Sequence, residues 1–287
     1  MNIDHISGHT RVAAVIGWPV EHSLSPIIHN AWFSHVARDW VYVAFPVEPK
    51  DLTNAISGMR ALHLGGLSVT MPHKEDVIAH LDAIDDIASA LRAVNCVGIQ
   101  GDQLVGTNTD GDGCCNAIEE QADVVFQDSR VAVLGAGGTA RAITAAAMRR
   151  GAQVVVVNRS AARAHELSDI MKSLPAPFHV GSVTIGTMDD VASCDVVINA
   201  TSVGMGTNDM PCDVGVLSDN AVVLDAVYSP LQTAWLRACA SKGCTTIDGL
   251  WMLIHQAMLQ QQWWFSESPD SAVMRAAAER ELERRRQ

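Results

Sequence analysis

The sequence lacks the features that mark secreted and membrane proteins. Its first residues, MNIDHISGHTR, contain no apolar stretch followed by a small-residue cleavage site, so we expect no signal peptide. No apolar run approaches the roughly 18 residues that a membrane-spanning helix requires. Positive charge is also scarce, since 20 Lys and Arg stand against 32 Asp and Glu and the net charge is -12. This balance argues against a nucleic-acid partner, although an acidic protein can still hold a locally positive pocket for a small anion.

Paired cysteines and metal-ligand spacings are missing as well. The seven cysteines are an odd number and include no CxxC pair. The eleven histidines include no HxxxH pair on a helix pattern, and His22 and His29 are the nearest approach to a cluster. We therefore expect a reduced, cytoplasmic protein with free thiols and without a metal site.

The 287 residues suffice for one large domain or two ordinary ones, and the middle of the chain has the clearer pattern. Its expected strands are apolar throughout rather than alternating, which is typical of a parallel sheet. Strands that alternate with helices predict a doubly wound, Rossmann-type α/β domain. The expected strands are 130–138, 152–160, 194–201 and 220–228, and the expected helices are 139–151 and 161–174.

The first hundred residues also alternate between strands and helices. A hairpin on a Gly-Asp turn is expected within 93–113, followed by a polar loop. The other expected strands are 11–19, 40–48 and 64–70, and the expected helices are 25–37, 49–62, 248–265 and a charged C-terminal helix. We expect two α/β domains: residues 1–110 with 249–287 would bind substrate, and residues 111–248 would form the Rossmann-type dinucleotide-binding domain.

The expected strand at 130–138 ends in a glycine-rich turn. Gly135, Gly137 and Ala140 fit the G-x-G-x-x-G/A pattern, and Gly138 adds a further glycine. Between a strand and a helix, this pattern lets the backbone approach a pyrophosphate at the helix N-terminus. The alternative is a glycine-rich turn that binds nothing.

The end of the next strand bears on which dinucleotide is bound. NAD-binding domains place Asp or Glu there to hold the ribose 2′-hydroxyl. This chain has Asn158, Arg159, Ser160 and Arg163 instead. Because an Arg fork pairs with a 2′-phosphate and an acidic side chain would repel it, the pattern favours NADP. In the alternative interpretation, both arginines are solvated cations at a helix start.

These motifs line up with one family: over nearly its whole length, the chain resembles the shikimate dehydrogenases, including their quinate/shikimate branch. Each segment alone is a modest signal, but together they follow the family's order. The matching segments are GWPVEHSLSPIIHN (17–30), GLSVTMPHK (66–74), AVNCVG (93–98), GTNTDGDG (106–113), GAGGTARA (135–142), NRS (158–160), INATSVGM (198–205) and GLWMLIHQA (249–257).

The resemblance implies reversible, NADP-dependent reduction of 3-dehydroshikimate to shikimate in a cleft between the domains, with NAD as an alternative cofactor. Lys74 and Asp110 would be the catalytic pair, and the substrate would be a cyclohexene or cyclitol carboxylate. The implied substrate-binding residues are Ser23, Ser25, Ser68, Thr70, Asn95, Tyr228 and Gln256. The implied cofactor-binding residues are Gly135, Ala136, Gly137, Gly138, Thr139, Ala140, Asn158, Arg159, Ser160, Arg163, Thr201, Gly249 and Met252.

Oxidation of a secondary alcohol requires one group that takes the hydroxyl proton as the hydride leaves. An amine does this when burial tunes its pKa downward against a nearby carboxylate. Lys74 with Asp110 fits that requirement. Each residue also has a structural reading, because most lysines are solvated surface groups, Asp110 can form an Asx turn in a polar loop, and Ser25 can cap a helix.

Three residues depart from the family pattern and leave the substrate open. Ser68 stands where the family motif carries Asn, Cys96 replaces the Thr that follows Asn95, and Trp251 occupies a position that is small in many relatives. A second hypothesis is therefore a paralogue for quinate or for an amino- or deoxy-analogue of shikimate. A third is a non-catalytic sensor of the cofactor or of a cyclitol. The sequence carries no signal for oligomeric state, and a homodimer is one option.

Overall fold

The computed structural model describes residues 6–285 and divides into two compact α/β units. The first comprises Met1–Thr109 and Ala257–Gln287, and the second Asp110–Gln256. Residues 110 and 249–256, which the sequence analysis assigned to the first domain, fall in the second unit. They do so because α4 begins at Asp110 and packs closely on the start of α9, where a Cβ on Gly113 would lie 2.6 Å from the Gln256 nitrogen. Part of the N-terminal segment for which no signal peptide is expected, residues 1–5, lies outside the described residues.

The first unit is built on a six-stranded mixed sheet in the order β2-β1-β3-β5-β6-β4. β1 pairs in parallel with β2 and β3, whereas β5 pairs antiparallel with β3 and β6. The expected hairpin is confirmed and turns at Gly101 and Asp102. The strands are β1 (Arg11–Gly17), β2 (Trp40–Pro46), β3 (Gly66–Val69), β4 (Ala83–Ile84), β5 (Cys96–Gln100) and β6 (Gln103–Thr107); the helices are α1 (Ser25–His35), α2 (Leu52–Ala61), α3 (Asp86–Leu91), the second part of α9 (Gly249–Phe265) and α10 (Ser271–Arg284).

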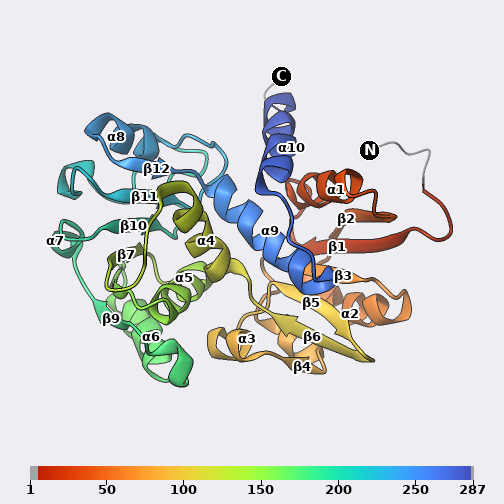
Figure 1. The fold of residues 1–287 in the computed structure, drawn as a ribbon. Coiled ribbons are helices and arrows are strands. Elements are labelled where there is room, and N and C mark those ends of the chain that lie inside the picture. The colour runs from red at the N-terminus through yellow and green to blue at the C-terminus, as the bar shows by residue number, and fades with distance from the viewer. Residues whose placement is uncertain (1–5, 286–287) are drawn as a thin grey trace. The chain divides into compact units, whose positions relative to one another are not determined.

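Both faces of this sheet are buried, which explains its nearly continuous apolar strands. Ala14 and Ile16 of β1 join the core under α2, and their neighbours Ala13 and Val15 join a second core that includes Phe33 of α1. In Figure 1, α1 and α10 lie side by side over this second face.

Two glycines admit the aromatic end of α9 onto the sheet. A Cβ on Gly66 would lie 2.6 Å from the Trp264 ring, and one on Gly98 would lie 2.5 Å from the Trp263 ring. The Trp264 indole N–H donates to the Val97 carbonyl oxygen at 3.1 Å. Glycine at these strand positions therefore sets how closely the helix approaches.

The second unit is a doubly wound, all-parallel sheet, as the sequence predicted, and its strands run in the order β12-β11-β10-β7-β8-β9. α5 packs on β7 and β8 and against α4, whereas α7 and α8 pack on the opposite face (Figure 1). The strands are β7 (Arg130–Leu134), β8 (Gln153–Val157), β9 (Ser182–Ile185), β10 (Val196–Asn199), β11 (Val222–Asp225) and β12 (Thr245–Ile247); the helices are α4 (Asp110–Ala122), α5 (Gly138–Arg149), α6 (Ala161–Lys172), α7 (Met188–Val191), α8 (Ala234–Lys242) and the first part of α9. The strand order reverses between β7 and β10, the position at which such sheets bind ligands.

The polar loop expected up to residue 113 is wrong, because α4 already starts at Asp110. Two glycines in its first turn give the segment the composition of a loop. Glycine is needed in this turn because the helices pack closely: a Cβ on Gly111 would lie 2.0 Å from the Ala142 carbonyl oxygen of α5.

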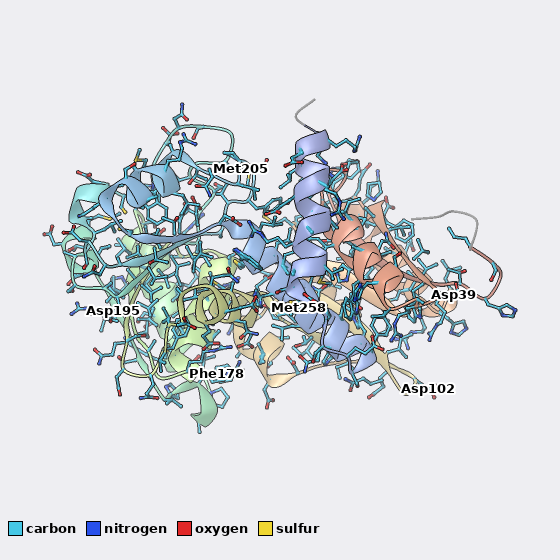
Figure 2. The ribbon with its side chains drawn as sticks, turned by 45° about the horizontal axis from the view of Figure 1, so that its top comes forward. Asp39, Asp102, Phe178, Asp195, Met205 and Met258 are labelled. Atoms are coloured by element: carbon cyan, nitrogen blue, oxygen red, sulfur yellow. The ribbon has the colours of Figure 1, made fainter. Side chains whose placement is uncertain are left out.

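All seven cysteines are free thiols, and all are buried. Burial raises the pKa of Cys115 and of Cys239 to about 12. Polar side chains instead line the loops, as Figure 2 shows for Asp102 in the β5–β6 turn and Asp195 before β10. Among residues 6–285, no helix is long and apolar enough to cross a membrane, and no group of three or more His, Cys, Asp or Glu side chains could hold a metal ion.

Candidate active site

Lys74 lies in the turn after β3, where it is half-buried. Its carbonyl oxygen accepts from the Val94 N–H at 2.8 Å, and the Asn95 carbonyl oxygen accepts from the Val69 N–H at 2.8 Å. The Asn95 N–H in turn donates to Thr107 at 3.1 Å. Three segments that are distant in sequence, those of Lys74, Asn95 and Thr107, are thus fixed side by side by backbone hydrogen bonds.

The Asn95 side chain is buried and fastened at its oxygen. Its Oδ1 accepts from the Thr109 N–H at 2.8 Å, and its Nδ2 lies 3.0 Å from the Thr109 hydroxyl. Thr109 was not selected from the sequence, although it stands within the GTNTDGDG motif. The next residue along the chain is Asp110, the first residue of α4, which is 8% exposed. A buried carboxylate at the start of a helix is favoured by the helix dipole.

The predicted carboxylate-binding hydroxyls of the first unit come from the start of α1 and the end of β3. Ser25 does not cap α1: the N-cap position is Leu24, and the Ser23 hydroxyl accepts from the Ser25 N–H at 3.2 Å. Within residues 6–285, neither the Ser25 nor the Thr70 hydroxyl makes a hydrogen bond, so both can bind a ligand. A Cβ on Gly17 would lie 2.4 Å from the Thr70 methyl group. The end of β1 can therefore lie this close to Thr70 only because residue 17 is glycine.

Ser68, the departure from the family motif, takes part in a buried polar network. The Tyr42 hydroxyl donates to its Oγ at 2.6 Å, and its Oγ donates to Gln260 Oε1 at 2.5 Å. Neither Tyr42 nor Gln260 was selected from the sequence. Cys96, the second departure, is a core residue: it is fully buried, burial raises its pKa well above the usual range, and it lies next to Trp264.

The glycine turn of the second unit has the geometry of a dinucleotide-binding turn. Gly135 has φ +121°, and a Cβ there would lie 3.0 Å from Thr201 and 3.2 Å from the Ala200 carbonyl oxygen. A Cβ on Gly137, in contrast, would meet nothing within 4 Å. α5 starts at Gly138, and its N-cap residue, Gly137, provides no side-chain cap for the first turn. The residues therefore fit a pyrophosphate at this helix N-terminus.

The end of β8 opens into a pocket of about 410 Å³, lined by Asn158, Arg159, Ser160 and Arg163. Ser160 caps α6, and its Oγ accepts from the Arg163 N–H at 3.5 Å. Both arginines are exposed, and within the described part of the chain neither has an ion-pair partner. The pocket carries no carboxylate, so its charge complements a phosphate group and not a bare ribose diol.

Thr201 lies beside the glycine turn but is engaged locally. Its hydroxyl donates to Asn199 Oδ1 at 2.7 Å. Asn199 Nδ2 donates to Asp225 at 2.8 Å, and the other Asp225 oxygen accepts from Thr233 at 2.7 Å. Burial raises the pKa of the Asp225 carboxyl. This network fixes the loops at the carboxyl ends of β10 and β11, and sequence reasoning missed Asn199 and Asp225 although INATSVGM contains the first.

The remaining predicted residues lie at the end of β11 and on α9. Tyr228 is half-buried in the loop after β11. Gly249 begins α9, and a Cβ there would lie 2.6 Å from the Ala226 carbonyl group, so only glycine fits. Met252 and Gln256 are both 8% exposed one and two turns further on. Trp251, the third departure, is half-buried, with its ring centroid 6.3 Å from that of His255.

Three family models match this chain. The shikimate dehydrogenase substrate-binding domain matches residues 15–97, the shikimate/quinate 5-dehydrogenase model matches residues 117–205, and the shikimate 5′-dehydrogenase C-terminal domain matches residues 249–279. The first two matches fall in the first and second units of the fold, and the third covers all of α9 and part of α10.

Whole-chain comparisons agree with these matches. The NADP(+) shikimate dehydrogenase of Geobacter metallireducens is 39% identical, over 94% of this chain and 96% of that protein. A crystal structure of a shikimate dehydrogenase in complex with NADP+ superposes with a TM-score of 0.89 at 35% identity, covering 96% of this chain and 97% of that one. The 5-ketofructose reductase of Gluconobacter sp. strain CHM43 also gives 0.89, at 31% identity, over 96% and 99% of the two chains. With its motifs in order, its two α/β units and these matches along its length, the chain belongs to the shikimate dehydrogenase family.

Proposed function

We propose that this protein is an NADP-dependent dehydrogenase that reversibly reduces 3-dehydroshikimate to shikimate. The observation that carries the proposal is the backbone arrangement that fixes Lys74 and Asn95 beside the strand that leads into Asp110. This arrangement supports Lys74 and Asn95 in the catalytic and hydroxyl-binding roles that the family resemblance implies. A non-catalytic sensor would not need a retained lysine and carboxylate.

Lys74 acts as the acid-base group of this reaction. In the oxidative direction, its neutral amine accepts the proton of the reacting hydroxyl, and in the reductive direction its ammonium returns it. Asp110 orients the amine and stabilises it when it is charged. When bound, NADP+ would supply the hydride acceptor, and NADPH the hydride donor, for the carbon that carries the reacting hydroxyl.

The pyrophosphate of the cofactor would lie at the N-terminus of α5, over Gly137, where the structure has space. Arg159 and Arg163 would pair with the 2′-phosphate. Met252 and Gly249 at the start of α9 would border the nicotinamide. We propose NADP as the preferred cofactor because the pocket after β8 is cationic, and NAD as a weaker alternative.

The substrate is a small ring that carries one carboxylate and several hydroxyls. Ser23, Ser25, Thr70 and Tyr228 would bind the carboxylate, since uncharged hydroxyl donors suit an anion. Asn95 and Gln256 would bind ring hydroxyls. The buried free thiols support a cytoplasmic, reducing location.

The second candidate is a paralogue for quinate or for another analogue of shikimate. Ser68 favours it, because a hydroxyl tied to Tyr42 and Gln260 cannot replace the two donors of the family's Asn. The structure named a 5-ketofructose reductase has the same TM-score, 0.89, as the shikimate dehydrogenase bound to NADP+. It shows that this fold also carries other carbonyl reductases.

Nicotinamide absorbance with purified protein tests the proposal. Shikimate and quinate are each crossed with NADP+ and NAD+. Fast turnover with shikimate and NADP+ would support the main proposal, and a higher kcat/KM with quinate would support the paralogue. Absence of turnover in all four assays, in a protein that still binds NADPH, would contradict the main proposal and quinate as substrate, and would point to another analogue of shikimate.

A further inference from the structure

Three polar side chains form a continuous hydrogen-bonded chain inside the first unit. Tyr42 of β2 is 1% exposed, Ser68 of β3 is 6% exposed and Gln260 of α9 is 1% exposed. The distances are 2.6 Å from Tyr42 to Ser68 and 2.5 Å from Ser68 to Gln260. Buried polar groups are costly unless they are satisfied, so the way these bonds are shared decides what Ser68 can still offer a ligand.

A backbone carbonyl fixes the direction of every bond in this chain. Gln260 Nε2 lies 3.3 Å from the Asn95 carbonyl oxygen, which can only accept. The amide nitrogen therefore faces Asn95, and the amide oxygen faces Ser68 and must accept from it. Burial raises the pKa of Tyr42, which keeps its hydroxyl protonated, so Tyr42 is the donor to Ser68.

These directions leave the Ser68 hydroxyl with one unused hydrogen-bonding position, a lone pair. A serine hydroxyl has one proton and two lone pairs. Its proton is committed to Gln260, and one lone pair is occupied by Tyr42. The lone pair that remains can accept a hydrogen bond and cannot donate one. An asparagine at this position would instead present amide donors.

We propose that Gln260 is a positioning residue for substrate specificity: by taking the Ser68 proton, it makes Ser68 a pure acceptor that selects a substrate with a donating hydroxyl at this point of the ring. This inference rests on the proposed function and specifies its substrate class. A ring that has lost this hydroxyl leaves the Ser68 lone pair unpaired, and one with a carbonyl there places two acceptors together. The same amide supports the Asn95 backbone, so the selection acts beside a second substrate-binding residue.

Steady-state kinetics with shikimate and its 4-deoxy-4-fluoro and 5-deoxy-5-fluoro analogues test this inference, because fluorine accepts a hydrogen bond weakly and cannot donate one. The variants are Gln260→Met, which matches the side-chain volume, Ser68→Ala and the double variant. Gln262→Met is the control, because Gln262 is exposed two residues further along α9. The dissociation constant for NADPH is measured alongside and is expected to stay unchanged in every variant.

The wild-type protein should prefer shikimate over one fluoro analogue by roughly 10- to 100-fold in kcat/KM, the range expected for one unpaired polar group. Gln260→Met should reduce this preference by at least about 5-fold, mainly through KM, because Ser68 can then rotate its proton toward the ligand. Ser68→Ala should reduce it as well. The double variant should show no further loss, since Gln260 acts through Ser68.

Two kinds of failure are distinguishable. A wild-type protein that turns over neither shikimate nor quinate would contradict the proposed function and this inference together. Wild-type turnover with an unchanged preference in Gln260→Met, an equal loss for all three substrates, or additive losses in the double variant would contradict the inference alone. If Gln260→Met does not fold, Gln260→Asn, which withdraws the amide from Ser68 by one methylene, takes its place.

Discussion

The imidazole of His29 stacks on the phenol ring of Tyr42, with the ring centroids 4.2 Å apart and the planes inclined by 7°. His29 is fully buried, and its Nδ1 lies 2.7 Å from the amide nitrogen of Gln261. Burial lowers the pKa of His29 to about 3. The ring is therefore neutral in the folded protein and protonates readily only after unfolding.

This pKa shift predicts acid sensitivity. Because the folded pKa lies below the unfolded value of about 6.5, protonation favours the unfolded chain, and stability is lost as the pH falls below about 6.5. The His29 contribution should cost about 1.4 kcal/mol between about pH 7.5 and about pH 5.5. Urea unfolding of wild type, His29→Phe and the exposed-site control His9→Phe measures it. Equal pH slopes in wild type and His29→Phe would contradict the prediction.

Two glycines of the glycine turn are expected to have different roles: Gly135 is required by the backbone conformation, and Gly137 leaves space for the cofactor. Gly135→Ala forces a side chain into φ +121° against Thr201 and should destabilise the protein by about 1–3 kcal/mol. Gly137→Ala enters open space at φ −84° and should leave unfolding nearly unchanged while weakening NADPH binding. Urea unfolding and a nicotinamide fluorescence titration distinguish the two. Unchanged NADPH affinity in Gly137→Ala would argue against a pyrophosphate at α5.

Arg159 should determine the choice between the two nicotinamide cofactors. Arg159→Ala should raise the KM for NADP+ by about 10- to 100-fold, the value of a lost charge-assisted bond, with little change for NAD+. Lys172→Ala, at the other end of α6, is the control for the change in net charge. Equal losses for both cofactors would mean that Arg159 does not contact the 2′-phosphate.

Lys74→Ala should remove acid-base catalysis and lower kcat by about 10²- to 10⁴-fold. NADPH affinity should be preserved, because the proposed cofactor-binding residues lie in the second unit. Asp110→Asn should also lower kcat, by a smaller factor, since it orients the amine and does not carry the proton. A Lys74→Ala variant with wild-type kcat would exclude Lys74 as the acid-base group.

The main parallel strands of the second unit could be predicted because apolar runs such as residues 154–157 need no information from other segments. β9 and β12 were missed because they are short and contain exposed polar positions. α4 was missed because its two glycines resemble a loop, and their purpose, close packing on α5 and on the start of α9, exists only in the folded chain.

The candidate site shows the same limit. Lys74, Asn95 and Asp110 stand in motifs whose order is visible in the sequence. The bond from Ser68 to Gln260 spans 192 residues, and the bond from Tyr42 spans 26. Nothing in a local pattern links these residues, because the sheet and α9 bring them together.

Because all seven thiols are buried, their rates of chemical labelling report local opening of the fold. A thiol-reactive reagent cannot reach any of them until the core around it opens, so the labelling rate reports how often that opening occurs. Cys96 lies in the first unit and the other six lie in the second. Mass spectrometry of labelled peptides would therefore measure the rate of local opening of each unit separately in unmodified protein. A bound cofactor would slow labelling only in the unit that it stabilises.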